Sequence, residues 1–403
     1  MSKSVALYCA LAVLAFGALS EAHAQAKAQV SAAAGKLLQD AQAASKSGKW
    51  ADCLSKLRQA EAAPGRNSYD SYVINELRGF CALRSNDFTT AVAAFETNLA
   101  SQFVDKSQIP SRTKSIIQLH YNARNYAKAV EFGQRAIEQG SADNDIYLLV
   151  AQSYYVQKDY SSARDFVRNW MRSQERRGQR PRENAIQIYL TSCINLKDAA
   201  CQTEGFEKLV TYYPNPESWQ NLMQSLFRSR SEAVQFNAFR LASEVGALTR
   251  ADDYTEMAQL ALERGLPGEA QAALEKAFAQ KLFTEKRDID RNTRLLEAAK
   301  ERAAQQKSGL AKAERDAASA ASGDAQVTVG QAFLSYGQAD KAVAAIQGGI
   351  KKGSLTSAPE AQLALGMALL KAGNKAEARR AFSAIKGDGD LERIGKLWAL
   401  RAR

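Results

Sequence analysis

Apolar positions recur along this chain at the spacing of an amphipathic helix. In stretches such as 363–382, apolar side chains follow one another at i, i+3, i+4 and i+7, which places them on one face of a helix. Turn-forming segments such as "KAGNK", "SYGQAD" and "ERGLPGE" interrupt the pattern. The pattern therefore predicts pairs of short helices joined by tight turns.

A pair of residues 12 positions apart brackets each of these turns, and in most cases both are small. Gly366 and Ala378 form one such pair. The same interval separates Gly330 and Ala342, Ala258 and Ala270, Ala151 and Ala163, Gly79 and Ala91, and Ala41 and Cys53. In two further turns a bulky residue, Ile117 or Ile188, precedes Ala129 or Ala200. The second members follow one another at 34 to 38 residues or about twice that, so the chain is a repeat of helical hairpins.

The spacing also predicts how the hairpins pack. Small residues where two helices cross allow their backbones to approach closely, and a larger side chain four residues later fills the adjacent groove. These larger residues are Phe382, Ile346, Leu274, Val167 and Phe95. Because one hairpin cannot cover its own apolar face, neighbours must stack. We predict an all-α α-solenoid of stacked helical hairpins, about nine or ten in number and some degenerate.

These residues give the chain a family resemblance. The segments "YLLVAQSYYVQKDYSSARDFV", "LALGMALLKAGNKAEARRAF" and "YTEMAQLALERGLPGEAQAAL" resemble tetratricopeptide repeats, with uneven quality over about residues 34–392. The resemblance implies a right-handed α-solenoid in which the first helix of each hairpin lines a concave face that binds peptides. By position, that face would carry Lys114, Gln118, Tyr121, Gln152, Tyr155, Arg182, Tyr189, Gln220 and Gln224. The stretch 209–223, "LVTYYPNPESWQNLM", is similar to repeat proteins associated with TonB–ExbB systems.

Two regions depart from the repeat. Met223 and Gln235 occupy positions that are small elsewhere, which predicts a splayed hairpin. Residues 281–322 are charged and rich in alanine, which fits either a degenerate repeat or a long exposed helix between two blocks. The expected organisation is therefore repeats over 25–280, this charged segment, and further repeats over 323–403.

The N-terminus has the pattern of a secretory signal peptide. Lys3 precedes an apolar run over residues 5–19, and Ala22-His23-Ala24 forms a small-residue cleavage motif. We expect cleavage after Ala24, which defines a signal peptide over the first 24 residues; an N-terminal membrane anchor is the alternative. No later run reaches about 18 uncharged apolar residues. A soluble periplasmic protein in a Gram-negative cell envelope is the expectation.

Four cysteines lie beyond this signal: Cys53, Cys81, Cys193 and Cys201. An even number in an oxidising compartment fits two disulfides. The favoured pairs are Cys193 with Cys201 across a short turn, and Cys53 with Cys81 between adjacent hairpins. Four free thiols are the alternative. A CxxC motif is absent, which argues against redox chemistry.

Charge and candidate chemistry narrow the function. The formal net charge is +11, and residues 172–183, "RSQERRGQRPRE", are the densest basic stretch. This stretch could meet an acidic partner, anionic lipid or a cell-wall polymer, or be only a solvated helix end. Nucleic acid is not an expected partner, because no recognition motif is present. His120 stands where the repeat usually has an aromatic residue, which favours a packed core histidine over a catalytic base.

The sequence provides no motif for catalysis, a metal or a cofactor. Only His23 and His120 are histidines, and HExxH, Walker and dinucleotide-binding patterns are absent. We therefore expect no metal, no cofactor and no enzyme. The expected function is a non-enzymatic scaffold that binds a protein or peptide partner in the cell envelope. A periplasmic protein that binds peptidoglycan or another anionic polymer is the alternative.

Overall fold

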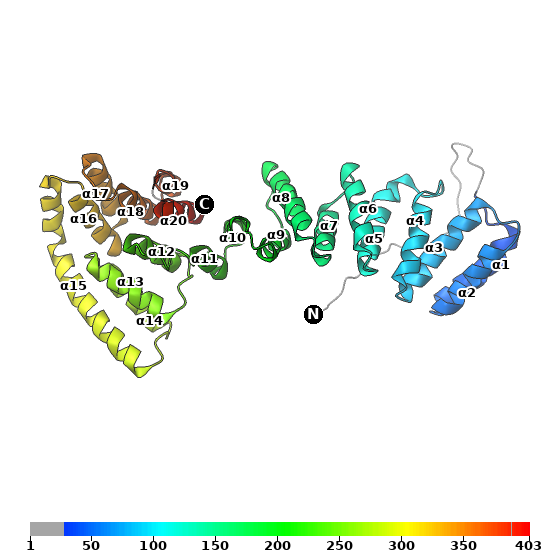
Figure 1. Cartoon of the computed structure of the whole chain (residues 1–403), viewed down its shortest axis with the longest axis horizontal. Coiled ribbons are helices and arrows are strands. Elements are labelled where there is room, and N and C mark those ends of the chain that lie inside the picture. Colours follow the sequence, from blue (N-terminus) through cyan, green and yellow to red (C-terminus); the bar gives the residue numbers. More distant parts are fainter. Residues whose placement is uncertain (1–27, 388) are drawn as a thin grey trace. The chain divides into compact units, whose positions relative to one another are not determined.

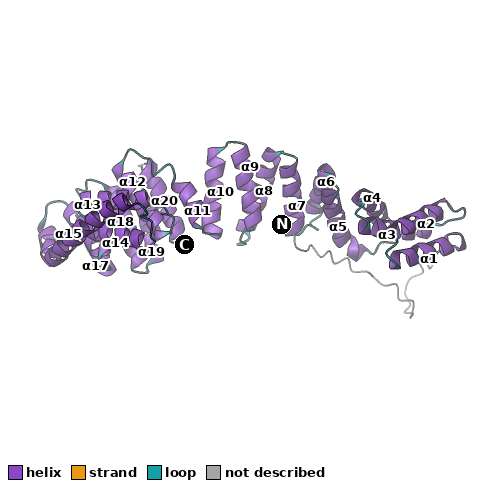
Figure 2. Cartoon of the chain, turned by 90° about the horizontal axis from the view of Figure 1, so that it is seen from below, coloured by secondary structure: helices purple, strands orange, loops and turns teal. Residues whose placement is uncertain are grey.

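A computed structural model describes residues 28–387 and 389–403 of the chain. The described part consists of helices and connecting loops, which confirms the predicted all-α fold (Figures 1 and 2). It divides into two compact units, one ending at Ser153 and the other comprising Tyr154–Arg403. The predicted signal peptide, 1–24, lies outside the described residues.

The first unit is a stack of helical hairpins. It contains α1 (Ala32–Lys46), α2 (Trp50–Ala62), α3 (Ser68–Arg84), α4 (Phe88–Leu99), the short 3-10 helix η1 (Lys106–Gln108), α5 (Ile109–Asn122), α6 (Tyr126–Glu138) and most of α7 (Asn144–Val156). From α1 to α6, each α-helix packs against the next one along the chain (Figure 1). The hairpins therefore stack in sequence order, as the repeat predicted.

The second unit begins with the same arrangement and then departs from it. It contains α8 (Tyr160–Arg176), α9 (Glu183–Asn195), α10 (Ala199–Tyr212), α11 (Pro216–Met223), α12 (Glu232–Glu244), α13 (Ala251–Glu263), α14 (Pro267–Ala279), α15 (Lys286–Ser319), α16 (Asp324–Ser335), α17 (Ala339–Lys352), α18 (Ala358–Lys371), α19 (Lys375–Ser383) and α20 (Gly389–Arg401). One continuous hydrophobic core runs from Val210 to Ala402.

The hairpin turns share one backbone conformation. The residue before the N-cap of the second helix has a positive φ: 84° at Gly373 and 63° at Lys158, for example. This left-handed residue reverses the chain after the first helix. At the next position, Asp159 caps α8 by accepting a hydrogen bond from the backbone N–H of Ser162. The polar turns in the sequence therefore mark helix ends correctly.

The predicted crossing of small and large residues is confirmed. A Cβ atom added to Gly366 would overlap the ring of Phe382, 16 residues later in the same hairpin. Gly79 stands in the same relation to the ring of Phe95. The glycine is needed because an aromatic side chain occupies the space that its own side chain would take.

Two hairpins reverse this distribution of volume. Ile117 is fully buried at the first position of its hairpin, and the residue 16 positions later is Gly133 rather than a large side chain. In α9 the buried first residue is Tyr189, and the residue 16 positions later is Gly205. A Cβ atom added to Gly133 would overlap Val150 of α7, and one added to Gly205 would press against Leu190 of α9, so each glycine makes room for a neighbouring aliphatic side chain.

This corrects one of the predicted pairs. The sequence pattern assigned Ile188 and Ala200 to the crossing of α9 and α10, but Ala200 is exposed. Tyr189 and Cys201, one residue further along, are the buried pair. Small size alone misplaced the register, because the adjacent Ala and Cys both satisfy it.

Residues 286–319 form α15, a single continuous helix of 34 residues. This result selects the long helix over the degenerate hairpin. Ala303, Leu310 and Ala317 recur every seven residues on its buried side, and the helix packs against α14 and α16. The helix lies inside the second unit, whereas the sequence had suggested a division around 281–322.

Helix α12 is buried on every side. Eight of its residues are buried, including Phe236, Asn237, Phe239 and Arg240. It packs against α13 and α20 but has little contact with α11, as expected for the splayed hairpin. Gln235 does not sit at a crossing: its amide donates to the Phe227 carbonyl and to the Glu256 carboxylate.

The four cysteines form two disulfides. Cys53 of α2 is bonded to Cys81 of α3, and Cys193 of α9 is bonded to Cys201 of α10. These are the two pairs that the sequence favoured. None of the described helices is both long and apolar enough to cross a membrane.

Candidate partner-binding surface

Two pairs of tyrosines stand at equivalent turns of consecutive hairpins. Tyr121 ends α5 and meets Tyr126 at the start of α6, with ring centroids 5.4 Å apart and an angle of 68° between the rings. Tyr155 of α7 meets Tyr160 at the start of α8 in the same edge-on manner, at 5.3 Å and 63°. The interval from Tyr121 to Tyr155 is 34 residues, one repeat. We call these the turn tyrosines.

The turn tyrosines combine rigidity with access to solvent. All four are half-buried, and none of their hydroxyl groups has a hydrogen-bond partner among the described residues. Partial burial, together with the neighbouring Tyr126, raises the pKa of Tyr121 above its ordinary value, so this phenol is neutral at physiological pH. Each pair therefore offers a fixed apolar ring surface and hydroxyl groups that can donate or accept.

On α5, the predicted contact residues Lys114, Gln118 and Tyr121 share one face by their spacing. Lys114 is already engaged: its ammonium donates to Asp143 at 2.7 Å and to Asp145 at 2.6 Å. Its charge is therefore neutralised within the chain. Gln118 is half-buried, and its amide donates to Asn122 one turn later on the same helix.

The other predicted contact residues lie in different surroundings. Gln152 is half-buried on α7, three residues before Tyr155. Arg182 is the N-cap residue of α9 and is half-exposed. Gln220 is half-buried on α11, and Gln224 is exposed at the end of that helix. The structure thus leaves these four at least partly accessible.

Tyr189 is not a contact residue, which corrects the sequence prediction. Its side chain has an exposed fraction of 0%. The hydroxyl donates to the Glu204 carboxylate at 2.6 Å and accepts from the Arg168 guanidinium at 3.0 and 2.7 Å. Burial and the hydrogen bond to Glu204 raise the pKa of Tyr189 to about 12. The residue is a core tyrosine because α9 carries its large side chain at the first position.

His120 also belongs to the core. It is 3% exposed, its Nε2 atom lies 2.6 Å from the Glu96 carboxylate, and its ring packs against Phe132. The sequence favoured this packed role over catalysis, and the burial agrees with it.

Sequence reasoning missed a buried polar network around α12. The Arg240 guanidinium makes two 2.7 Å hydrogen bonds to the Glu269 carboxylate and a third, at 3.0 Å, to Gln331. Glu360 of α18 accepts from Asn237 of α12 and from Arg264. In the sequence, this network is visible only as polar residues within an otherwise apolar stretch. That pattern does not indicate which residues they contact.

The C-terminal helix, α20, contacts the end of α11 and the end of α12. Arg393 of α20 donates to the Leu222 carbonyl and to the Ser225 hydroxyl, both at 2.8 Å, beside the end of α11. Arg401 of α20 and Lys371 of α18 both contact Glu244 at the end of α12. Helix α12 thus makes contacts with several other helices of the chain.

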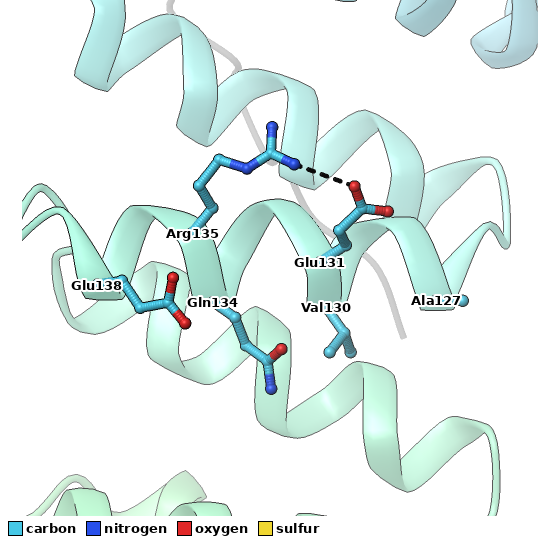
Figure 3. A pocket seen from close by; sticks show the side chains of 6 residues that line it. All are labelled: Ala127, Val130, Glu131, Gln134, Arg135 and Glu138. Carbon is cyan, nitrogen blue, oxygen red and sulfur yellow. Dashed lines mark hydrogen bonds and ion pairs between the residues drawn. The ribbon is translucent and has the colours of Figure 1, made fainter.

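A shallow depression of about 400 Å³ lies beside α6. Six residues of this one helix line it: Ala127, Val130, Glu131, Gln134, Arg135 and Glu138 (Figure 3). Val130 and Gln134 point to one side of the helix, whereas Glu131 and Arg135 form an ion pair on the other. The described lining is that of a solvated helix face.

Comparison with known proteins identifies the repeat. The tetratricopeptide-repeat family model matches residues 115–173 and 329–390. The first match contains both pairs of turn tyrosines, and the second contains the crossing of Gly366 with Phe382. No curated protein matches the chain.

Solved repeat structures resemble the chain at low identity. The C-terminal part of a repeat protein from Cytophaga hutchinsonii is 15% identical, with coverage of 63% of this chain and 98% of that one and a TM-score of 0.33. A tetratricopeptide-repeat protein from Parabacteroides merdae is 12% identical, with coverage of 84% and 100% and a TM-score of 0.28.

A third solved structure is the TPR2AB-domain:pHSP90 complex of yeast Sti1. It is 12% identical, with coverage of 74% and 100% and a TM-score of 0.26. Proteins built from such repeats generally mediate protein–protein interaction. The two matched segments, together with the hairpin packing described above, show that this chain contains tetratricopeptide repeats.

Proposed function

We propose that this protein is a non-enzymatic scaffold that holds a peptide segment or partner domain through its turn tyrosines, with each pair acting as a contact of its own. The observation that carries the proposal is the recurrence of one half-exposed tyrosine pair at the same turn of two consecutive repeats. Tyrosine is enriched among the residues that dominate binding energy, because its ring buries a large area at a small entropic cost. Hydroxyl groups without partners in the chain can then fix the orientation of a bound peptide.

The proposed setting is the periplasm of a bacterial cell. The signal pattern over residues 1–24 supports export, and the pairing of all four cysteines beyond it suits an oxidising compartment. An accessory role in a TonB–ExbB transport system is the finest version of this proposal and rests on residues 209–223 alone. Recovery of a TonB–ExbB component with the tagged protein would test it.

The test is crosslinking in cells followed by affinity purification of the tagged protein. We expect Tyr121→Ala and Tyr155→Ala each to weaken partner binding by about 30-fold, the effect of losing one dominant contact. Tyr69→Ala is the matched control, since Tyr69 is a half-buried tyrosine that packs on Phe103 outside the turn pairs. Circular dichroism melts establish that each variant folds. Unchanged partner recovery from both turn variants would refute the proposal.

The alternative function is binding of peptidoglycan or another anionic envelope polymer. The observations in its favour are the net charge of +11 and the arginines of residues 172–183. Binding of this kind weakens steeply with salt, because exposed charges are screened. Sedimentation with isolated sacculi at low and high salt tests it, and a chain that stays in the supernatant at low salt would exclude this alternative.

A further inference from the structure

The end of α8 and the loop to α9 carry the densest positive charge of the chain. Residues 172–183 contain five arginines and two glutamates, a formal charge of +3. One of these acids, Glu175, is neutralised within the chain, because it accepts from Lys208 at 2.6 Å and from the Tyr212 hydroxyl at 2.9 Å. The other, Glu183, is exposed at the start of α9.

Four of the arginines are exposed: Arg172, Arg176, Arg177 and Arg180. We call them the arginine corner. None of them makes an ion pair or a side-chain hydrogen bond with any described residue. Arginines earlier in the same helix behave differently, since Arg164 pairs with Asp165 and Arg168 bonds Tyr189. The corner therefore holds donors that the fold itself does not use.

One member of the corner is held in place. The Arg180 guanidinium lies 3.6 Å from the centre of the Tyr213 ring. Tyr213 is itself fixed, because its hydroxyl donates to the Pro181 carbonyl at 3.0 Å. Stacking covers the face of a guanidinium and leaves the N–H groups on its edge free to bind an anion.

Packing does not account for this cluster. Arg172 and Arg176 are one helical turn apart, and like charges at that spacing destabilise a helix. The helix dipole favours a positive charge only in the last turn, where Arg176 and Arg177 lie. Arg172 precedes that turn and Arg180 follows the helix, so the dipole explains neither.

We propose that the arginine corner binds an acidic segment of the partner protein. Guanidinium groups form two parallel hydrogen bonds with a carboxylate, so several of them suit a run of Asp and Glu. A lipid surface fits less well, because membrane-surface sites usually add apolar side chains. The exposed large apolar residues of the described chain are Val30, Val156, Ile194, Leu196 and Ile289, all outside this segment. The inference rests on the proposed function and deepens it.

The experiment measures binding of a fluorescent peptide of alternating Glu and Gly to the full chain by anisotropy. The test variant is Arg176→Gln/Arg177→Gln/Arg180→Gln. The control variant, Arg287→Gln/Arg294→Gln/Arg302→Gln, removes equal charge from the exposed side of α15. We expect the test variant to bind at least about tenfold more weakly and the control to change by less than about twofold, because only close charges contribute strongly.

Three outcomes would overturn the inference. Equal weakening in both variants would mean that overall charge alone attracts the peptide. Arginine-dependent binding to vesicles containing phosphatidylglycerol, or to sacculi, without binding to the peptide would assign the corner to a lipid or a polymer. The third outcome is no peptide binding by the wild-type chain. In that case, loss of partner recovery in the Tyr121→Ala variant would still uphold the proposed function, so the two failures are distinguishable.

Discussion

The hairpins of the first unit and helix α12 of the second both have apolar faces to bury, but they bury them against different parts of the chain. In the first unit, a helix covers its apolar face with its neighbours in sequence: the core cluster from Ala34 to Cys81 draws on α1, α2 and α3 alone. In the second unit, α12 is covered by distant helices. Arg240 bonds Gln331, 91 residues away, and Glu244 bonds Arg401, 157 residues away.

The difference has consequences for stability. A stack of local hairpins can lose a terminal hairpin while the rest stays folded, because each repeat depends only on its neighbours. A helix held by contacts far along the chain cannot leave without opening several helices together. We therefore expect the part of the second unit around α12 to unfold cooperatively and the first unit to unfold gradually.

The largest expected effect comes from Arg240→Met. This change leaves the Glu269 carboxylate, which is only 20% exposed, without its charge partner. Breaking a buried ion pair from one side costs about 3–5 kcal/mol of unfolding free energy. Urea unfolding followed by tryptophan fluorescence measures the loss, because Trp219 and Trp398 belong to the core around α12.

Two further variants sharpen this test. In the first unit, Arg135→Met removes an exposed pair with Glu131 and is expected to cost less than about 0.5 kcal/mol. The double variant Arg240→Met/Glu269→Leu should recover part of the stability lost by Arg240→Met, since no charge is then left unpaired. Equal losses for Arg240→Met and Arg135→Met would contradict the claimed contrast between the units.

The second prediction concerns the crossing of α18 and α19. Gly366→Ala places a methyl group where the Phe382 ring lies, so we expect a loss of about 1–3 kcal/mol from overpacking. The same substitution at Gly309, which has open space around it in the middle of α15, should instead stabilise by about 0.5–1 kcal/mol. Thermal melts followed by circular dichroism at 222 nm compare the two.

A second substitution tests whether the volume of the Phe382 ring causes this loss of stability. Phe382→Leu vacates part of the ring's space, so Gly366→Ala should cost less in that background than in the wild type. Strictly additive effects of the two changes would show that the glycine matters only for its backbone, not for the volume of the crossing.

The sequence predicted the local parts of this fold and not the distant ones. Hairpins, turns and the Gly366–Phe382 crossing follow from periodicity and residue size over about one repeat, which a single sequence displays. Whether Gln331 and Glu360 reach α12 depends on the total rotation that accumulates over successive repeats. No short sequence pattern indicates that total.

The candidate site shows the same limit. Tyr121 and Tyr155 are half-buried at equivalent turns 34 residues apart, as the spacing of the repeat predicted, although the α5 hairpin carries the bulky Ile117 at its crossing. Tyr189 was predicted on the surface because the pattern placed the crossing at Ile188 and Ala200. The crossing lies one residue later, at Tyr189 and Cys201, so the tyrosine is buried. A shift of one residue is hard to detect in the sequence, because Ala200 and Cys201 are both small.

The third prediction, Tyr189→Phe, has a smaller expected effect than Arg240→Met and tests the burial of this tyrosine directly. The hydroxyl bridges Arg168 and Glu204, so its loss should cost about 1–2 kcal/mol near pH 8. Tyr121→Phe should cost nearly nothing, because that hydroxyl has no partner among the described residues. Urea midpoints compare the two variants at constant ionic strength.

The pH dependence of the unfolding free energy distinguishes a buried, hydrogen-bonded hydroxyl from an aromatic ring that only fills space. The pKa of Tyr189 is about 12 in the folded chain, against about 10 for an unfolded tyrosine. The unfolded state therefore loses its proton first, and the stability held by this neutral phenol is present below pH 10 and lost as the pH rises toward 12. Tyr189→Phe removes that slope, so its stability should approach the wild-type value above about pH 10. Parallel curves for the two proteins would mean that Tyr189 ionises as an exposed tyrosine does, and that the hairpin of α9 and α10 does not carry its large residue inside.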